Sequence, residues 1–223
     1  GDLISERFLN LFGGCTSYSS NYSSGAAGFV VPYVLGSTPP GFDPGTLRDS
    51  KMIILWGANL AVTRMGTAMP LHTLEAKKRG VPIVVIDPRR TDTVRHLGTE
   101  WIPCRPGTDL AMMFAVLQVL IQEDLVDWDF IKRSSIGFEQ LQRYVMGEQD
   151  NIIRSPTWAE SICGAPADVI TRFAQQYGSI RPTALIPGYS IQRTRYGEDT
   201  FRMTIALQVA TGNLGISGGS SGG

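Results

Sequence analysis

The sequence predicts an α/β protein with a doubly wound, mostly parallel sheet and flanking helices. Short apolar runs without alternation, at residues 51–55 and 83–86, are typical of strands that a parallel sheet buries on both faces. A helix-forming segment separates the two runs, which gives the strand, helix, strand order of a right-handed βαβ unit. Each run ends in polar sequence containing glycine or aspartate, at the sheet edge where such proteins bind ligands.

The elements of the first half follow from local patterns. Apolar residues spaced three to four apart predict a helix within residues 1–14, and these residues are Leu3, Ile4, Phe8, Leu11 and Phe12. A serine-rich stretch, residues 13–28, comes next. After it the expected elements are a strand at 51–55, a helix at 68–79, a strand at 83–86, a strand at 100–103 and a helix at 110–121. Gly80 is expected to end the first of these helices in the left-handed conformation.

The second half is predicted to be largely helical before the chain returns to the sheet. Residues 125–177 carry helical patterns, and Ser155 and Pro156 supply the N-cap and first position of one helix. A strand is expected at 183–187, and a polar, glycine-opened loop follows it. A last helix is expected at 199–211.

This organisation predicts two parts of unequal size. Residues 49–223 are expected to form the α/β domain, with residues 125–178 as a helical elaboration of it. Residues 1–48 are expected to form the edge of a neighbouring domain, so the chain is interpreted as a piece of a longer protein.

Composition and charge narrow the classes of function. The chain has 20 basic and 20 acidic side chains and a pI near 6.9. It therefore has no overall electrostatic field that would favour binding to nucleic acid or anionic lipid. No apolar run reaches the roughly 18–20 residues that span a bilayer, and direct membrane insertion is not expected. Cys15, Cys104 and Cys163 lack the CxxC spacing of metal sites and are each expected to be small buried hydrophobes.

The polar loops at strand ends carry chemistry that suits a nucleotide. Backbone N–H groups and guanidinium groups bind phosphates, and a carboxylate can accept from both guanine N1–H and the exocyclic amine. Asp87 and Asp109 fit the last role, although each also fits a simple turn or helix cap. Trp56 fits either a core position or a stacking platform. The arginines that fit either phosphate contacts or surface ion pairs are Arg89, Arg90, Arg105 and Arg193. Neither GxGxxG nor GxxxxGK[ST] occurs, which argues against a nicotinamide dehydrogenase or a P-loop phosphotransferase.

Five motifs resemble those of one family, in order and over essentially the whole chain. They are WGAN (56–59), IDPRRTDT (86–93), WIPCRPGTDLAM (101–112), GYSIQRTRYGE (188–198) and TGNLGISGG (211–219). The sequence resembles the molybdopterin oxidoreductases of the dimethyl sulfoxide reductase family, in particular the catalytic subunits of anaerobic respiratory dimethyl sulfoxide reductases. The resemblance implies the central domain of a larger fold that holds molybdenum through the dithiolenes of two molybdopterin guanine dinucleotides.

The family's cofactor contacts carry over to matching positions. By similarity, the residues lining one dinucleotide are Trp56, Gly57 and Asn59, with Asp87, Pro88 and Arg89 at its nucleoside end and Thr108 and Asp109 at the guanine. The residues implied to approach the pterin and pyrophosphate are Gly188, Ser190, Gln192 and Arg193.

The serine-rich stretch is assigned a role only through this resemblance. The family's segment before the first strand supplies the protein ligand to molybdenum, and in the related reductases a serine follows a D-Y pair. Here the matching residues are Asn21, Tyr22, Ser23 and Ser24. Ser23 is expected to be the metal ligand and catalytic residue, and Ser24 is the alternative if the register differs by one. An alkoxide oxygen suits hard, high-valent molybdenum. Asn21 replaces the expected aspartate, and without the resemblance the stretch fits an exposed serine linker.

The resemblance also implies a reaction and partners. These enzymes reduce an S-oxide or N-oxide by oxygen-atom transfer, with a [4Fe-4S] cluster expected in the full-length protein and not in this chain. Implied partners are an iron–sulfur electron-transfer subunit and a membrane anchor subunit, which imply a periplasmic or membrane-associated location. The chain alone is expected to be catalytically silent. The alternative is a non-catalytic nucleotide-binding or assembly module with the same α/β core.

Overall fold

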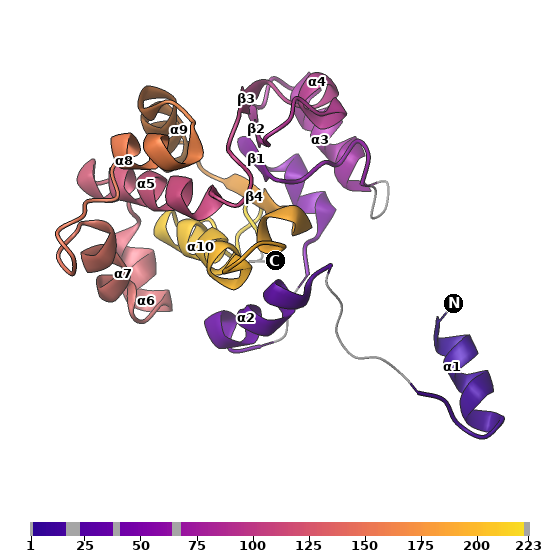
Figure 1. Ribbon diagram of the computed structural model, residues 1–223. Coiled ribbons are helices and arrows are strands. Elements are labelled where there is room, and N and C mark those ends of the chain that lie inside the picture. The colour runs from indigo at the N-terminus through magenta and orange to yellow at the C-terminus, as the bar shows by residue number, and fades with distance from the viewer. Residues whose placement is uncertain (1, 17–22, 38–40, 64–67, 221–223) are drawn as a thin grey trace.

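The computed structural model describes residues 2–16, 23–37, 41–63 and 68–220. Its core is a four-stranded, fully parallel sheet in the order β3-β2-β1-β4 (Figure 1). The strands are β1 (Met52–Trp56), β2 (Ile83–Ile86), β3 (Glu100–Ile102) and β4 (Thr183–Pro187). Helices connect the parallel strands, and the strand order extends from β1 in both directions, as in doubly wound sheets. This arrangement confirms the predicted α/β class.

Helices occupy most of the remaining described chain. Their bounds are α1 (Asp2–Leu11), α2 (Gly25–Leu35), α3 (Ala68–Lys78), α4 (Asp92–His96), α5 (Asp109–Gln122), α6 (Trp128–Ser134), α7 (Phe138–Val145), α8 (Pro156–Cys163), α9 (Ala167–Ser179) and α10 (Gly197–Ala210), with 3-10 turns η1 (Pro44–Arg48) and η2 (Tyr189–Gln192). The Ser155 hydroxyl caps α8 as predicted, because it accepts from the Trp158 N–H at 3.2 Å.

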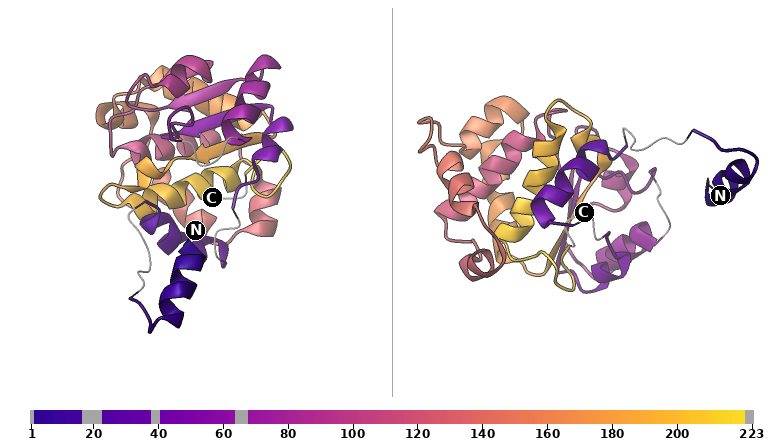
Figure 2. Two further views of the ribbon diagram at one scale, coloured as in Figure 1. Left: turned by 90° about the vertical axis from the view of Figure 1, so that its right-hand side faces the viewer. Right: turned by 90° about the horizontal axis from the view of Figure 1, so that it is seen from below.

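The sheet is buried on both faces, which explains its continuous apolar strands. Ile53 and Leu55 of β1 point into a small core under η1, α3 and α4. Ile54 and Trp56 alternate with them and join the larger core under α5, α8, α9 and α10. Figures 1 and 2 show the sheet between these two helical layers.

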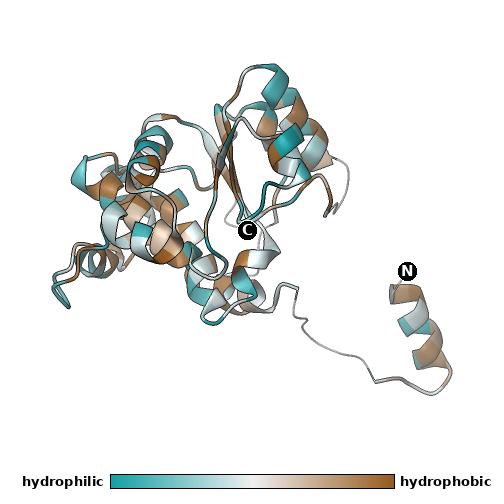
Figure 3. Cartoon of the chain, turned by 45° about the horizontal axis from the view of Figure 1, so that its top comes forward, coloured by the Kyte–Doolittle hydropathy of each residue, from teal (hydrophilic) through white to brown (hydrophobic). Residues whose placement is uncertain are grey.

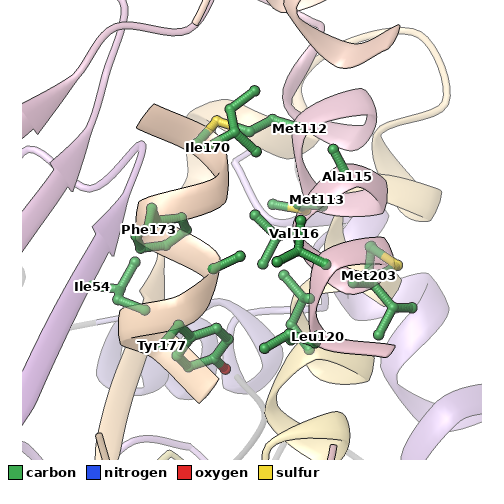
Figure 4. Close-up of a cluster of buried hydrophobic side chains, with 14 of the residues drawn as sticks. Ile54, Met112, Met113, Ala115, Val116, Leu120, Ile170, Phe173, Tyr177 and Met203 are labelled. Atoms are coloured by element: carbon green, nitrogen blue, oxygen red, sulfur yellow. The ribbon is translucent and has the colours of Figure 1, made fainter. Parts of the chain in front are cut away.

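The larger core is built mainly from α5 and α9. Phe173 and Tyr177 of α9 stack with ring centroids 6.2 Å apart and face the apolar side chains of α5, including Val116 and Leu120 (Figure 4). Burying side chains of this size contributes about 1.5–3 kcal/mol each relative to exposure. This helical layer supports one face of the sheet and does not cover the carboxyl ends of the strands, where the loops lie.

The outer edge of β4 is completed by side chains. The Asn213 Oδ1 accepts from the Thr183 N–H at 2.9 Å. The Ser220 hydroxyl accepts from the Leu185 N–H at 3.0 Å and donates to the Leu185 carbonyl at 2.8 Å. The segment after α10 therefore satisfies the edge strand, and its Gly218 carbonyl accepts a further bond from Ser50 at 2.8 Å.

The two N-terminal helices lie in different surroundings. α2 packs on α10, where Ala27, Val30 and Val31 join Phe201 and Ile205 in a third apolar cluster. α1 lies apart from the other described elements (Figures 1 and 2). It carries hydrophobic residues, brown in Figure 3, and its large apolar side chains are exposed. No helix in the described parts of the chain has the length and apolarity required to cross a bilayer.

The cysteines differ from the expectation in one case. Cys104 and Cys163 are buried, as predicted, but Cys15 is exposed. Cys15 follows α1, which contributes no side chain to the three apolar clusters, so nothing covers it.

Candidate functional site

The loops after β1, β2 and β4 meet at the carboxyl edge of the sheet. The chain order reverses between β1 and β4, which makes this edge the topological switch point where doubly wound sheets bind ligands. The Gly57 N–H donates to the Ile86 carbonyl at 2.8 Å, and the Gly188 N–H donates to the Trp56 carbonyl at 2.7 Å. Each loop is thus tied to the neighbouring strand where it leaves the sheet.

Two glycines allow the β1 and β4 loops to cross in contact. A Cβ on Gly188 would lie 1.9 Å from the Gly57 carbonyl oxygen and 2.8 Å from the Ala58 Cα. Gly57 has a φ of +64°, and a Cβ there would meet the Ser190 Oγ at 2.8 Å. The Ser190 hydroxyl also donates to the Gly57 carbonyl at 2.9 Å. Only bare backbone fits at this crossing.

A cavity of about 590 Å³ opens beside the crossing, within the size range of small-molecule sites. Helix α2, the start of α3 and the three strand-end loops line it. Seven of the predicted cofactor-binding residues lie on its wall: Gly57, Asn59, Asp87, Arg89, Gly188, Ser190 and Arg193. The fold therefore brings together residues from motifs more than 100 positions apart.

Hydrogen bonds fix the polar side chains of the β1 and β2 loops. The Thr93 hydroxyl donates to the Asn59 Oδ1 at 2.7 Å and accepts from the Ala61 N–H at 2.9 Å. Asp87 is 8% exposed, and its Oδ1 accepts from the Arg89 N–H at 2.9 Å. Sequence reasoning missed Thr93. The available signal was its position as the last residue of the IDPRRTDT motif.

Trp56, which is fully buried, and Asp109, which is partly buried, form a hydrogen-bonded pair that does not line the cavity. Trp56 is fully buried, packs edge-on against Phe173, and its Nε1 donates to the Asp109 Oδ1 at 3.0 Å. Burial raises the pKa of the Asp109 carboxyl above its ordinary value. The bond from Trp56 opposes this shift in the Asp109 pKa, and the charge of Asp87 adds to it.

Thr108 and Pro88 also lie off the cavity wall. Thr108 precedes α5, but its hydroxyl donates to the Arg105 carbonyl at 2.7 Å and makes no side-chain cap to the helix. Pro88 is exposed between Asp87 and Arg89. Each is adjacent in sequence to a charged residue of the predicted site: Thr108 to Asp109, and Pro88 to Asp87 and Arg89.

Gln192 connects the β4 loop to the start of α2. It is 4% exposed, its Oε1 accepts from the Ala27 N–H at 2.6 Å, and its Nε2 donates to the Ser23 carbonyl at 3.4 Å. Ser24 lines the cavity, whereas Ser23 is exposed beside it. Asn21 and Tyr22 lie outside the described residues. Gln192 therefore holds the serine pair at the cavity through backbone contacts, a role the motif itself did not indicate.

The geometry defines an α/β protein of the doubly wound class with a polar, glycine-lined ligand cavity at its switch point. The family model for molybdopterin oxidoreductases matches residues 3–223. The chain belongs to the molybdopterin oxidoreductase family.

Individual relatives agree with this assignment. The chain is 34% identical to the dimethyl sulfoxide reductase DmsA of Escherichia coli K12, over 100% of this chain and 29% of that protein. It is 32% identical to a trimethylamine-N-oxide reductase of Haemophilus influenzae, over 97% of this chain and 27% of the relative. The structure of acetylene hydratase from Pelobacter acetylenicus superimposes with a TM-score of 0.72 at 23% identity, over 97% of this chain and 28% of that one, which shows the shared fold. The chain thus spans less than a third of these relatives' length.

Proposed function

We propose that this chain is the central part of a molybdenum-dependent oxidoreductase and binds one guanine dinucleotide end of its pterin cofactor in the switch-point cavity. The observation that carries the proposal is the wall of the cavity, where the bare backbones of Gly57 and Gly188 lie beside a carboxylate and two guanidinium groups. Residues 49–223 supply these groups, and residues 1–48, which add α2 to the lining, are proposed to be the edge of a neighbouring domain.

The residues present fit such a group. Arg89 and Arg193 are exposed at the cavity, and within the described chain neither guanidinium has an ion-pair partner. Both are therefore available to phosphates, for which guanidinium geometry is well suited. Asp87 uses one carboxylate oxygen on the Arg89 N–H, and its other oxygen can accept from a nucleoside. The glycines let a pyrophosphate approach backbone N–H groups closely.

Asp109, Trp56 and Thr108 do not line the cavity wall, and they are proposed to contact the nucleotide from outside it. Asp109 keeps one oxygen on Trp56, so it can receive a guanine amine with its second oxygen only once the nucleotide has entered beside α5. Burial raises the pKa of the Asp109 carboxyl, and a hydrogen-bond donor from the base would favour its charged form.

Ser23 is proposed as the protein ligand to molybdenum, with Ser24 as the alternative. Two observations support this proposal: Ser24 lines the cavity, and the Gln192 Nε2 donates to the carbonyl of the neighbouring Ser23. When bound, the molybdenum–pterin group would supply the two electrons that reduce the oxide and would accept its oxygen atom. The chain's own contribution is then to position that group and the serine hydroxyl, and to exclude water with α2, which packs on α10.

The reaction we propose is R₂SO + 2 H⁺ + 2 e⁻ → R₂S + H₂O, or the same conversion of an N-oxide, in anaerobic respiration. Two relatives carry the names dimethyl sulfoxide reductase and trimethylamine-N-oxide reductase, which supports an oxide substrate. The electrons are proposed to come from an iron–sulfur subunit through a [4Fe-4S] cluster in the full-length protein. A membrane anchor subunit would then place the enzyme at the membrane, on its periplasmic side.

The cavity is tested by titrating the 223-residue chain with GDP as the probe, in calorimetry. Arg89→Ala should weaken GDP binding by about 10-fold, because a charge-assisted bond to phosphate is lost. Arg90→Ala is the matched control: Arg90 is the next residue, equally exposed, and lies off the cavity wall. Equal loss in both variants, or no binding of GDP to the parent chain, would contradict the cavity assignment.

The metal ligand is tested in the full-length enzyme. Ser23→Ala is expected to abolish reduction of dimethyl sulfoxide while molybdenum content, measured by mass spectrometry, is retained. Ser24→Ala is the control, expected to keep turnover. Reversed results would assign the role to Ser24, and unchanged turnover in both would favour the non-catalytic module.

A further inference from the structure

Two buried cysteines from distant parts of the sequence meet beside the β3–α5 connection. Cys104 is 3% exposed and Cys163, the last residue of α8, is 1% exposed. The Arg105 N–H donates to the Cys163 carbonyl at 2.9 Å, which places the two backbones side by side, and both cysteine side chains belong to the larger apolar core. Among the described residues no third metal-binding side chain joins them.

The surroundings hold this pair in place from both sides. The Arg105 guanidinium donates to the Ser161 and Ile162 carbonyls at 3.4 and 3.3 Å, and so caps the end of α8. The Cys104 Sγ lies 3.6 Å from the Thr108 Oγ1. These hydrogen bonds hold the two segments that carry the cysteines against each other.

The two thiols differ in acidity. The hydrogen bond from Cys104, together with the Ala165 N–H and the Arg105 charge, lowers the pKa of Cys163 to about 7. Its bond to Cys163, its burial and the nearby Asp109 charge raise the pKa of Cys104. Cys163 is thus the thiol that forms a thiolate more readily, and thiolates are the attacking species in disulfide exchange.

We propose that Cys104 and Cys163 form an intrachain disulfide when the chain meets a disulfide oxidant. The Cys163 thiolate attacks one sulfur of the oxidant, breaks its S–S bond and releases one thiolate. The Cys104 thiolate then attacks the mixed disulfide at Cys163 and releases the second. The pair loses two electrons and two protons, and the oxidant becomes two thiols.

This bond would join the end of α8 to the connection that carries Thr108 and Asp109. It would close a long loop that contains α5, α6, α7 and α8, which restricts the unfolded chain. The proposal concerns these two sulfurs alone and stands whether or not the cavity binds a nucleotide.

The test uses the Cys15→Ser chain, which removes the exposed third thiol. Natively purified protein, and protein refolded from urea, are equilibrated with glutathione buffers, quenched with an alkylating reagent, unfolded and weighed by mass spectrometry. The expected product carries no alkyl group and yields a linked Cys104–Cys163 peptide. The disulfide of the native chain should be half-formed in a glutathione buffer that is about 10-fold less oxidising than the buffer needed in urea. The reason is that folding raises the effective concentration of the two thiols.

Two alkylated thiols in both preparations, or glutathione attached to Cys163 without the linked peptide, would overturn the proposal. Half-formation of the disulfide at the same glutathione buffer in the native chain and in urea would also overturn the proposal, because the fold would then not favour the bond. Cys104→Ser and Cys163→Ser, each made in the same background, must show no change of urea midpoint on oxidation, while their parent shifts to higher urea.

Discussion

Replacing Gly188 by alanine is expected to separate the two loops that form the cavity wall. Gly188 has a φ of −83°, which alanine adopts without strain, so the effect is steric. The added Cβ would lie 1.9 Å from the Gly57 carbonyl oxygen, whereas ordinary contact begins at 3.4 Å, so the loops must part by roughly 1.5 Å. The neighbouring atoms are backbone, which cannot rotate away.

The cost follows from what this movement breaks. Overpacking of this kind costs about 1–3 kcal/mol. The Gly188 N–H bond to Trp56 and the Ser190 bond to the Gly57 carbonyl, 2.7 and 2.9 Å long, would be lost or weakened, at about 1 kcal/mol each. The expected loss in the free energy of unfolding is therefore about 3–5 kcal/mol, measured by urea unfolding followed by circular dichroism.

Gly28→Ala provides the control. Gly28 lies inside α2, and a Cβ there would meet no atom within 4 Å, so alanine should stabilise the chain by about 0.5–1 kcal/mol. If Gly188→Ala unfolds within about 0.5 kcal/mol of the parent, the crossing is not the tight backbone contact described above, and the reasoning fails.

Three further outcomes are expected. Gln192→Ala should cost about 1–3 kcal/mol and speed hydrogen exchange of the Ala27 amide, because that buried N–H loses its acceptor; unchanged exchange would contradict the link to α2. Asp109→Asn should remove part of the pH dependence of unfolding: a carboxyl with a raised folded-state pKa stabilises most below its unfolded-state pKa and loses this as pH rises through the folded-state pKa. The parent should therefore gain stability relative to the variant on acidification, in urea midpoints measured across the acidic range, and a gain on alkalinisation would reverse the assignment. Ser220→Ala should cost about 1–3 kcal/mol and expose the Leu185 amide to exchange, whereas the exposed Ser217 should tolerate alanine with less than about 1 kcal/mol; equal effects would argue against side-chain completion of the strand edge.

The strands were predictable because their signals are local. The strand at 83–86 has the predicted bounds, and so does the one at 183–187, since continuous apolar runs between prolines or polar residues leave little choice of register. The first strand lies one residue further along the chain than the expected 51–55, from Met52 to Trp56, and the Trp56 side chain joins the larger core. Helix α2 was not anticipated: its apolar run contains Pro32, and its stability comes from packing on α10.

The site could be predicted in part. Motif positions placed the glycines and the charged residues of the cavity wall, because these follow directly after strands whose ends meet. The partners that fix them come from elsewhere, and no local pattern shows that Thr93 holds Asn59 or that Gln192 holds the start of α2. The same is true of the proximity of Cys104 and Cys163, which lie far apart in the sequence.

The completed edge of β4 has a consequence for how this chain behaves at high concentration. Strands at the border of a sheet recruit strands from other molecules when their N–H groups are open, which starts edge-to-edge aggregation. Along β4 the outward donors of Thr183 and Leu185 are taken by Asn213 and Ser220, and the next position is Pro187, which has no donor. This border therefore offers no template to a neighbouring molecule, so the chain is protected on this side from growth into fibrils.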